Sequence, residues 1–191
     1  MKLYDKTVDY LLEQSKKKGA LNVLYFISAI ESFIFPIPPD VLLAPIASTK
    51  KYNWVLLAIN TTISSVIGGI IGYFIGKYFF YDFIINYNLI SSEKIDLAKS
   101  LFKEHGFMII FVAGFTPIPY KIFTITAGIV NILFIPFIIS SLVGRGLRFL
   151  IVSSLFHYYG MAIAESSKKY FDIVCIILVI IAFIYISLNL N

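Results

Sequence analysis

The chain has 191 residues, of which 59% are hydrophobic and 14% charged, and its mean hydropathy is +0.85. Soluble domains rarely have this composition, which favours an integral membrane protein instead. The net charge of +5 lies in short basic clusters, which argues against nucleic acid as a partner and agrees with the positive-inside rule. A single cysteine, Cys175, excludes disulfides and a cysteine-based metal site.

Residues 1–20 are predicted to form an amphipathic helix on the membrane surface. Apolar residues recur there at helical spacing, and three lysines, Lys16 to Lys18, close the segment. A secretory signal peptide is excluded, because the segment contains acidic residues and has no apolar core.

Two short apolar segments follow on either side of a proline-rich break. As a helix, Leu21–Phe35 would rise about 22 Å, which is less than the hydrocarbon thickness of about 30 Å. Val41–Ser48 is shorter still, and the break between them contains Pro36, Pro38 and Pro39. The pattern predicts a re-entrant hairpin, whose broken backbone must lie inside protein or beside a water-filled cavity.

The segment Trp54–Gly76 has 23 residues and no charge, so it is predicted to cross the membrane. Gly68, Gly72 and Gly76 recur every four residues within it. Such a stripe of small residues allows another helix to approach closely. The stripe is interpreted as a packing surface, with a direct substrate groove as the alternative.

A polar stretch at 77–105 precedes the second pair of short apolar segments. Its helical pattern predicts a helix that stops at Gly106. Phe107–Phe115 and Ile122–Ile129 then form a second predicted hairpin. The break between these two segments contains Pro117 and Pro119.

The remaining chain contains two apolar segments long enough to cross, Ile132–Met161 and Ile173–Leu188. Three regions are therefore predicted: an interfacial helix at 1–20, a membrane domain at 21–163, and a linker with a final transmembrane helix at 164–191.

The two proline breaks form an internal repeat. A shift of 81 residues aligns Pro36, Pro38 and Asp40 with Pro117, Pro119 and Lys121. Each unit is a broken hairpin followed by one crossing, so successive units must lie in opposite orientations. Inverted repeats with broken helices are typical of transporters. The predicted fold is an all-α polytopic membrane protein of two inverted repeats.

Five ionisable residues lie within apolar segments: Glu31, Asp40, Lys121, Arg145 and Arg148. Each costs roughly 2.5–3.5 kcal/mol at the centre of a membrane helix, so such residues are functional candidates. The two arginines are the only ones among 16 basic residues, and their i, i+3 spacing places them on one helix face. Arginine presents a planar fork that suits phosphate.

Structural alternatives exist for each charge. Asp40 could cap the helix that follows Pro39. Lys121 could snorkel to the interface, or it needs a partner, either Asp40 or an anionic ligand. Glu31 is a candidate proton carrier or the static partner of an arginine, and the arginines could form buried bridges to Glu31 or Asp40. The five charges sum to +1, so a monoanionic headgroup would neutralise the pocket.

No metal-ligand spacing, glycine-rich phosphate loop or nucleophile motif is present in the sequence, so neither a metal, a cofactor nor an enzymatic activity is predicted. His157 is interpreted as an interfacial residue with a metal ligand as the alternative.

Four motifs occur in order: ESFIFPIPPDVLLAP, GGIIGYFIG, FKEHGFMIIFVAGFTPIPYKIFTITAG and GRGLRF. This pattern resembles the DedA family of bacterial membrane proteins, which carry the VTT or SNARE-associated domain, and is most similar to its YqaA-like branch. The resemblance implies two opposed re-entrant hairpins in the bacterial inner membrane. It also implies movement of lipids or lipid carriers such as undecaprenyl phosphate between leaflets, and links to the proton-motive force and to phospholipid scrambling.

The resemblance assigns Glu31 and Asp40 to the acidic residues of the family's first hairpin. The second hairpin departs from the commoner pattern, which has one arginine shortly before the proline and another three residues after it. Gly114 occupies the first position, and Lys121, four residues after Pro117, replaces the second. The anion-binding geometry therefore cannot be identical, although Arg145 and Arg148 could supply the missing charge.

Together these features predict a transporter or scramblase for an anionic membrane lipid. Lys121, Arg145 and Arg148 would bind the phosphate, and Glu31 and Asp40 would couple movement to protons. The alternatives are a small-ion or drug–proton antiporter and a non-transporting membrane organiser. Assembly as a homo-oligomer is left open.

Overall fold

The computed structural model describes residues 19–34, 38–80, 92–116 and 118–161, together with Ile177 and Ile180. The elements in these ranges are all helical: α2 Ala20–Glu31, α3 Asp40–Ser48, α4 Trp54–Ile75, the π-helical η1 Gly76–Phe80, α6 Ser92–Phe115, α7 Tyr120–Ile129 and α8 Phe134–Tyr159. Trp54–Phe80 and Phe134–Tyr159 are long and apolar enough to cross a membrane. The all-helical class is thus confirmed.

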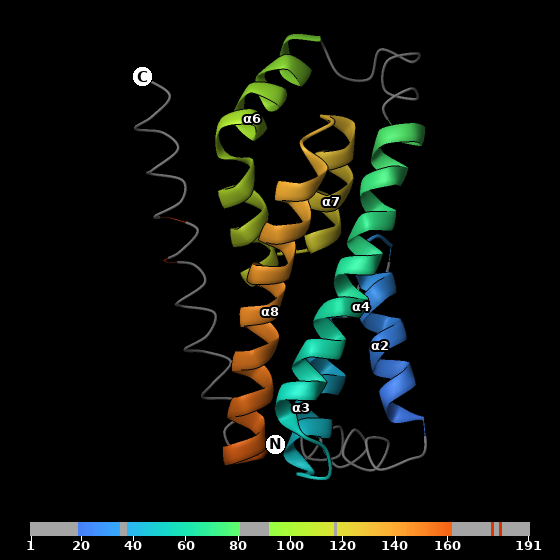
Figure 1. Ribbon diagram of the computed structural model, residues 1–191, viewed down its shortest axis with the longest axis vertical. Helices are drawn as coiled ribbons and strands as arrows, with labels where there is room; N and C mark the ends of the chain where they lie inside the picture. Colours follow the sequence, from blue (N-terminus) through green and yellow to red (C-terminus); the bar gives the residue numbers. More distant parts are fainter. Residues whose placement is uncertain are drawn as a thin grey trace, which may run out of the picture.

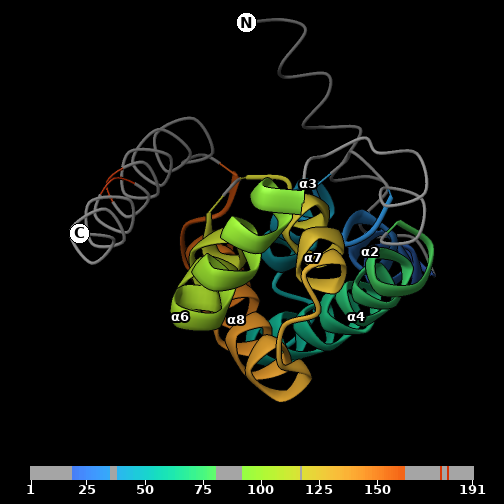
Figure 2. The same ribbon diagram turned by 90° about the horizontal axis from the view of Figure 1, so that it is seen from above.

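Two long helices extend over most of the height of the molecule, and the shorter helices lie in pairs beside them. In Figure 1, α4 and α8 extend over both halves, while α2 and α3 lie in the lower half and α6 and α7 in the upper half. Each short pair reverses direction near mid-height. Seen from above, α7 lies between α6 and the α2–α4 pair (Figure 2).

The proline-rich breaks lie at these reversals. Pro39 directly precedes α3, and Pro119 directly precedes α7, where a residue without an N–H removes no helical hydrogen bond. Pro38 begins the described part of the first break. Pro36 and Pro117 lie outside the described residues, as do most of the interfacial helix at 1–20 and most of the segment at 164–191.

Apolar side chains cover much of the outer surface, whereas many polar side chains lie in the interior. The outer face of α4 exposes Ile59, Ile63, Ile67 and Ile71, one residue per turn. Serine, threonine and arginine side chains are instead fully or almost fully buried, among them Ser65, Thr61, Ser140 and Arg145. Water would not favour such a surface, whereas hydrocarbon would.

The glycine face of α4 and the start of η1 form the surface on which α2 and α7 pack. A Cβ atom at Gly68 would overlap the Ala29 carbonyl of α2, and one at Gly76 would overlap the Ile125 carbonyl of α7. Between them, a Cβ at Gly72 would lie 3.2 Å from the Phe33 Cβ beyond α2. This stripe therefore brings α2 and α7 to one face of α4.

The prediction that a helix stops at Gly106 is wrong. α6 continues through this residue from Ser92 to Phe115. A glycine ends a helix when it adopts a left-handed conformation, but Gly106 is not among the residues with positive φ. Residues 92–105 of the polar stretch and the first apolar segment of the second predicted hairpin are therefore one helix.

Replacing Gly68 with alanine should destabilise the fold by about 1–3 kcal/mol, because the new methyl group meets backbone atoms of α2. The matched control is Gly106→Ala, whose Cβ would meet only Phe102 Cδ1 at 3.7 Å and Phe102 Cβ at 3.9 Å, both ordinary van der Waals distances. Unfolding by sodium dodecyl sulfate in mixed micelles measures both variants. Equal stability of the two variants would contradict the packing role of Gly68.

Candidate functional site

The first buried ion pair joins α8 to α2. Arg145 Nη2 donates to Glu31 Oε2 at 2.7 Å, and its Nε donates to the Ser65 hydroxyl of α4 at 2.7 Å. Only 2% of the arginine side chain and 10% of the glutamate side chain are exposed. The guanidinium also lies 5.0 Å from the ring centroid of Tyr120 and 4.7 Å from that of Phe149, which is favourable for a desolvated cation.

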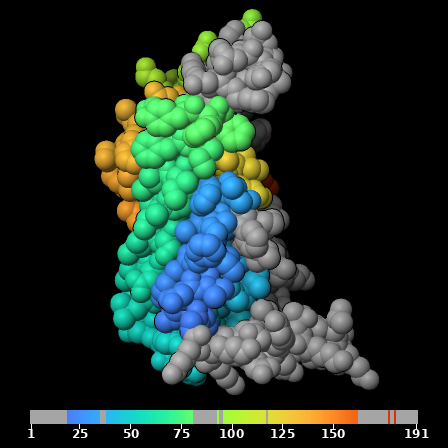
Figure 3. All heavy atoms as spheres, turned by 90° about the vertical axis from the view of Figure 1, so that its right-hand side faces the viewer, coloured from blue at the N-terminus to red at the C-terminus, as the bar shows by residue number. Residues whose placement is uncertain are grey.

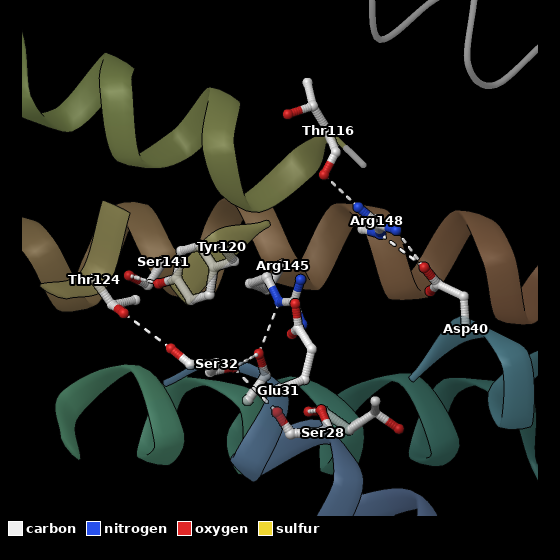
Figure 4. A network of polar contacts seen from close by, with 12 residues as sticks. Ser28, Glu31, Ser32, Asp40, Thr116, Tyr120, Thr124, Ser141, Arg145 and Arg148 are labelled. Carbon is white, nitrogen blue, oxygen red and sulfur yellow. Dashed lines mark hydrogen bonds and ion pairs between the residues drawn. The ribbon is translucent and has the colours of Figure 1, made fainter. Parts of the chain in front are cut away.

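The second ion pair joins α8 to both proline breaks (Figure 4). Arg148 donates from Nε to Asp40 Oδ2 at 3.1 Å, from Nη2 to the same oxygen, and from Nη1 to the Thr116 carbonyl. Asp40 is the first residue of α3, and Thr116 directly follows α6. Arg148 therefore connects the two short pairs through one side chain.

The two oxygens of the Asp40 carboxylate differ in their hydrogen bonds. Oδ2 accepts both hydrogen bonds from Arg148, whereas Oδ1 is buried without a hydrogen-bond partner among the residues that the structure describes. Its N-terminal position does not make Asp40 a hydrogen-bonding cap, because Pro39 is the N-cap residue and no side-chain cap bond forms there. Capping of α3 by a hydrogen bond to the Asp40 side chain is therefore wrong, although its carboxylate lies in the first turn of α3, where a negative charge is favourable.

Lys121 lies at the junction of α2 and α7. Its Nζ donates to the Ile34 carbonyl at 3.0 Å, so it does not pair with Asp40 as one alternative proposed. One turn along α7, the Thr124 hydroxyl lies 2.9 Å from the Ser32 carbonyl and 3.0 Å from the Lys121 carbonyl of its own helix. Two side chains of α7 thus cover carbonyl groups at the end of α2, and Figure 3 shows α7 next to that end.

Buried hydroxyl groups lie beside these charges, and they were not among the predicted site residues. The Ser32 and Ser65 hydroxyl oxygens are 2.8 Å apart, and the Tyr120 hydroxyl donates to Ser141 (Figure 4). A detectable signal was the run NTTISS inside the uncharged segment that forms α4. Hydroxyl side chains in an apolar crossing helix indicate a buried polar surface.

The structure therefore brings four of the five predicted charges into two pairs and leaves the fifth beside a neutral carbonyl. The structural alternative for Glu31 and the arginines, a buried bridge, is the arrangement observed. Within the described ranges, no group of three histidine, cysteine or acidic side chains is placed to bind a metal ion. His157 has its ring 5.3 Å from that of Tyr158, near the end of α8.

Comparison with known protein families identifies the family of this chain. The VTT domain matches residues 37–158, more than half of the chain. This chain belongs to the VTT domain (DedA) family. It is therefore a membrane protein of a family that includes a protein named as a transporter.

Three relatives indicate how far the likeness extends. An uncharacterized protein of Haemophilus influenzae is 40% identical over 188 residues, covering 96% of this chain and 97% of the relative. A homolog from Histophilus somni is 38% identical over 184 residues, covering 95% and 94%. "Undecaprenyl phosphate transporter A" of Bacillus subtilis is 32% identical over 114 residues, covering 56% of each chain. No solved structure matches.

Removing one partner of the Arg145–Glu31 pair should destabilise the protein by about 3–5 kcal/mol, because an uncompensated charge remains buried. We expect this for Glu31→Gln and for Arg145→Gln in micelle unfolding experiments. The double variant should be less unstable than the sum of the two, which a double-mutant cycle measures.

The matched control for this cycle is Lys99→Gln, which removes the exposed 3.4 Å pair between Lys99 and Asp96 on α6. Its effect should stay below about 1 kcal/mol, as for most surface pairs. Additive effects of the Glu31 and Arg145 substitutions would show that the buried pair is not energetically coupled.

Proposed function

We propose that this protein moves an anionic lipid or lipid-linked carrier between the leaflets of the bacterial cytoplasmic membrane, as a multi-pass transporter or scramblase. In this proposal the pairs α2–α3 and α6–α7 are two opposed re-entrant hairpins of an inverted repeat. They enter from opposite sides and meet at the five charged residues near mid-height. A bound headgroup would reach these residues from either leaflet as the hairpins move.

The observation that carries the proposal is the pair of carboxylate–arginine bridges at the meeting point of the hairpins. Arg145 contacts Glu31 of α2, while Arg148 contacts Asp40 of α3 and Thr116 beyond α6. Buried charges of this kind are costly in hydrocarbon and are found where ions or charged substrates pass. Their position at two broken helices agrees with the binding sites of repeat-built transporters.

The bridges also suggest how protons would take part. A carboxylate that accepts a proton loses its charge, so its arginine becomes available to another anion. The guanidinium fork can then bind two phosphate oxygens in place of the carboxylate. During movement between the leaflets, Glu31 and Asp40 would thus link proton binding to phosphate binding by Arg145 and Arg148, whereas Lys121 would bind the phosphate with both bridges intact.

A lipid is favoured over a soluble anion by the surroundings of Lys121. This side chain is half-buried, and its neighbours Ile34 and Ile122 are 64% and 55% exposed. An apolar rim suits acyl or isoprenoid chains next to a headgroup. The Bacillus subtilis relative, which is named as a transporter of undecaprenyl phosphate, points to the same class of substrate.

The test is leaflet exchange of labelled undecaprenyl phosphate or labelled phospholipid in liposomes that contain the purified protein. We expect exchange by the unmodified protein, dependence on an imposed pH gradient, and at least a tenfold loss in Glu31→Gln and in Arg145→Ala/Arg148→Ala. Exchange unaffected by either variant would disprove the proposed site. Absence of exchange in folded protein would disprove the proposed function.

The second candidate is a membrane organiser, which is favoured by the fact that both arginines already have carboxylate partners. In that case the bridge alone matters, so the exchanged variant Asp40→Arg/Arg148→Asp should retain function. A lipid transporter should lose at least 90% of its exchange activity in this variant, because the anion site then has a carboxylate in place of an arginine. Movement of small ions in liposomes without the lipid would instead indicate a proton antiporter.

A further inference from the structure

The five charged residues differ in whether a partner of opposite charge neutralises them. Glu31 with Arg145 and Asp40 with Arg148 form two pairs whose formal charges cancel. The partner of Lys121 is a backbone carbonyl, which carries no net charge. The uncompensated charge among the five intramembrane ionisable residues is therefore one positive unit, located at Lys121 Nζ.

The hydrogen bond of Lys121 is one that an anion can replace. In a continuing helix, the Ile34 carbonyl would accept from the residue four positions later, but this is Pro38, which has no N–H. Lys121 Nζ of α7 donates to the Ile34 carbonyl instead, at 3.0 Å. A phosphate oxygen is a stronger acceptor for an ammonium group than a neutral carbonyl is, because the bond is charge-assisted on both sides.

The arginines are less available while their carboxylates are ionised. A phosphate that took Arg145 from Glu31 would leave that carboxylate buried without a counter-charge, which is strongly unfavourable. The first contact of an incoming anion is therefore Lys121, with both bridges intact. The charge that this arrangement can neutralise is one negative unit.

We propose that the site selects a phosphate group with a single negative charge, which binds at Lys121 Nζ in place of the Ile34 carbonyl. This proposal rests on the proposed function and specifies its substrate class. A phosphodiester headgroup has this charge at any physiological pH. A phosphomonoester carries about −1.5 to −2 at pH 7, with a second pKa of about 6, so it fits only after taking up a proton.

Binding measurements on the purified full-length protein in uncharged detergent test the charge rule. Calorimetry would compare dihexanoyl phosphatidylglycerol, a diester, with dihexanoyl phosphatidic acid, a monoester, at pH 7.5 and pH 5.5. The diester should bind with the same affinity at both values, within about twofold. The monoester should bind about twentyfold more tightly at pH 5.5, where its singly charged form predominates.

Three variants assign the binding to Lys121. Lys121→Gln should weaken binding of both lipids at least tenfold, and Lys121→Arg, which keeps the charge, should restore most of it. The matched control is Lys103→Gln on the exposed surface of α6, which should bind like the unmodified protein. Tighter diester binding at pH 5.5 would indicate that protonation of a carboxylate frees an arginine to bind the headgroup. This result would overturn the proposal.

Two further results would overturn it: monoester binding at pH 7.5 as tight as diester binding, or unchanged affinity in Lys121→Gln. Binding of inorganic phosphate is measured separately. A free ion that binds as tightly as the lipids would refute a lipid as the substrate but not the preference for a single negative charge. Lipid binding that follows the charge rule without leaflet exchange would refute the proposed function and leave the inference intact.

Discussion

The pairing of two arginines of α8 with two carboxylates of the first hairpin is the interaction on which the centre of the molecule depends. Arg145 and Arg148 are one turn apart on a single helix, yet they contact α2, α3, α4 and the end of α6. Hydrocarbon offers no solvation to a charge, so each of these contacts is needed. The position of both proline breaks is thereby defined relative to one long helix.

The proline breaks create the second constraint. A proline removes the N–H that would cover a carbonyl one turn earlier, and an uncovered carbonyl is costly away from water. At the first break, Lys121 covers the Ile34 carbonyl, whose helical donor would have been Pro38, and at the second break, Arg148 covers the Thr116 carbonyl just beyond the end of α6. In both cases the donor is a cation from another element, so the breaks are stable only in the assembled fold. Movement of a hairpin must therefore exchange these bonds for others.

Much of this arrangement was predictable from the sequence, because it depends on local patterns. The lengths of the apolar segments, the positions of the prolines and the five charges within apolar segments were sufficient to predict the all-helical fold and the region where the charges gather, but not that α6 continues through Gly106. Which charge meets which was not predictable, since the paired residues are 114 and 108 positions apart. The aligned repeat suggested Asp40 with Lys121, but Arg148 pairs with Asp40 through two of its N–H groups and donates a third to the Thr116 carbonyl.

The order of these partners along the chain has a consequence for how the protein is made. Glu31 and Asp40 leave the ribosome more than a hundred residues before the arginines that neutralise them. At a synthesis rate of about 5–20 residues per second, the first hairpin waits roughly 5–20 s for α8. During this interval neither carboxylate has its arginine partner. The contacts at the centre of the molecule can therefore form only after α8 has been synthesised.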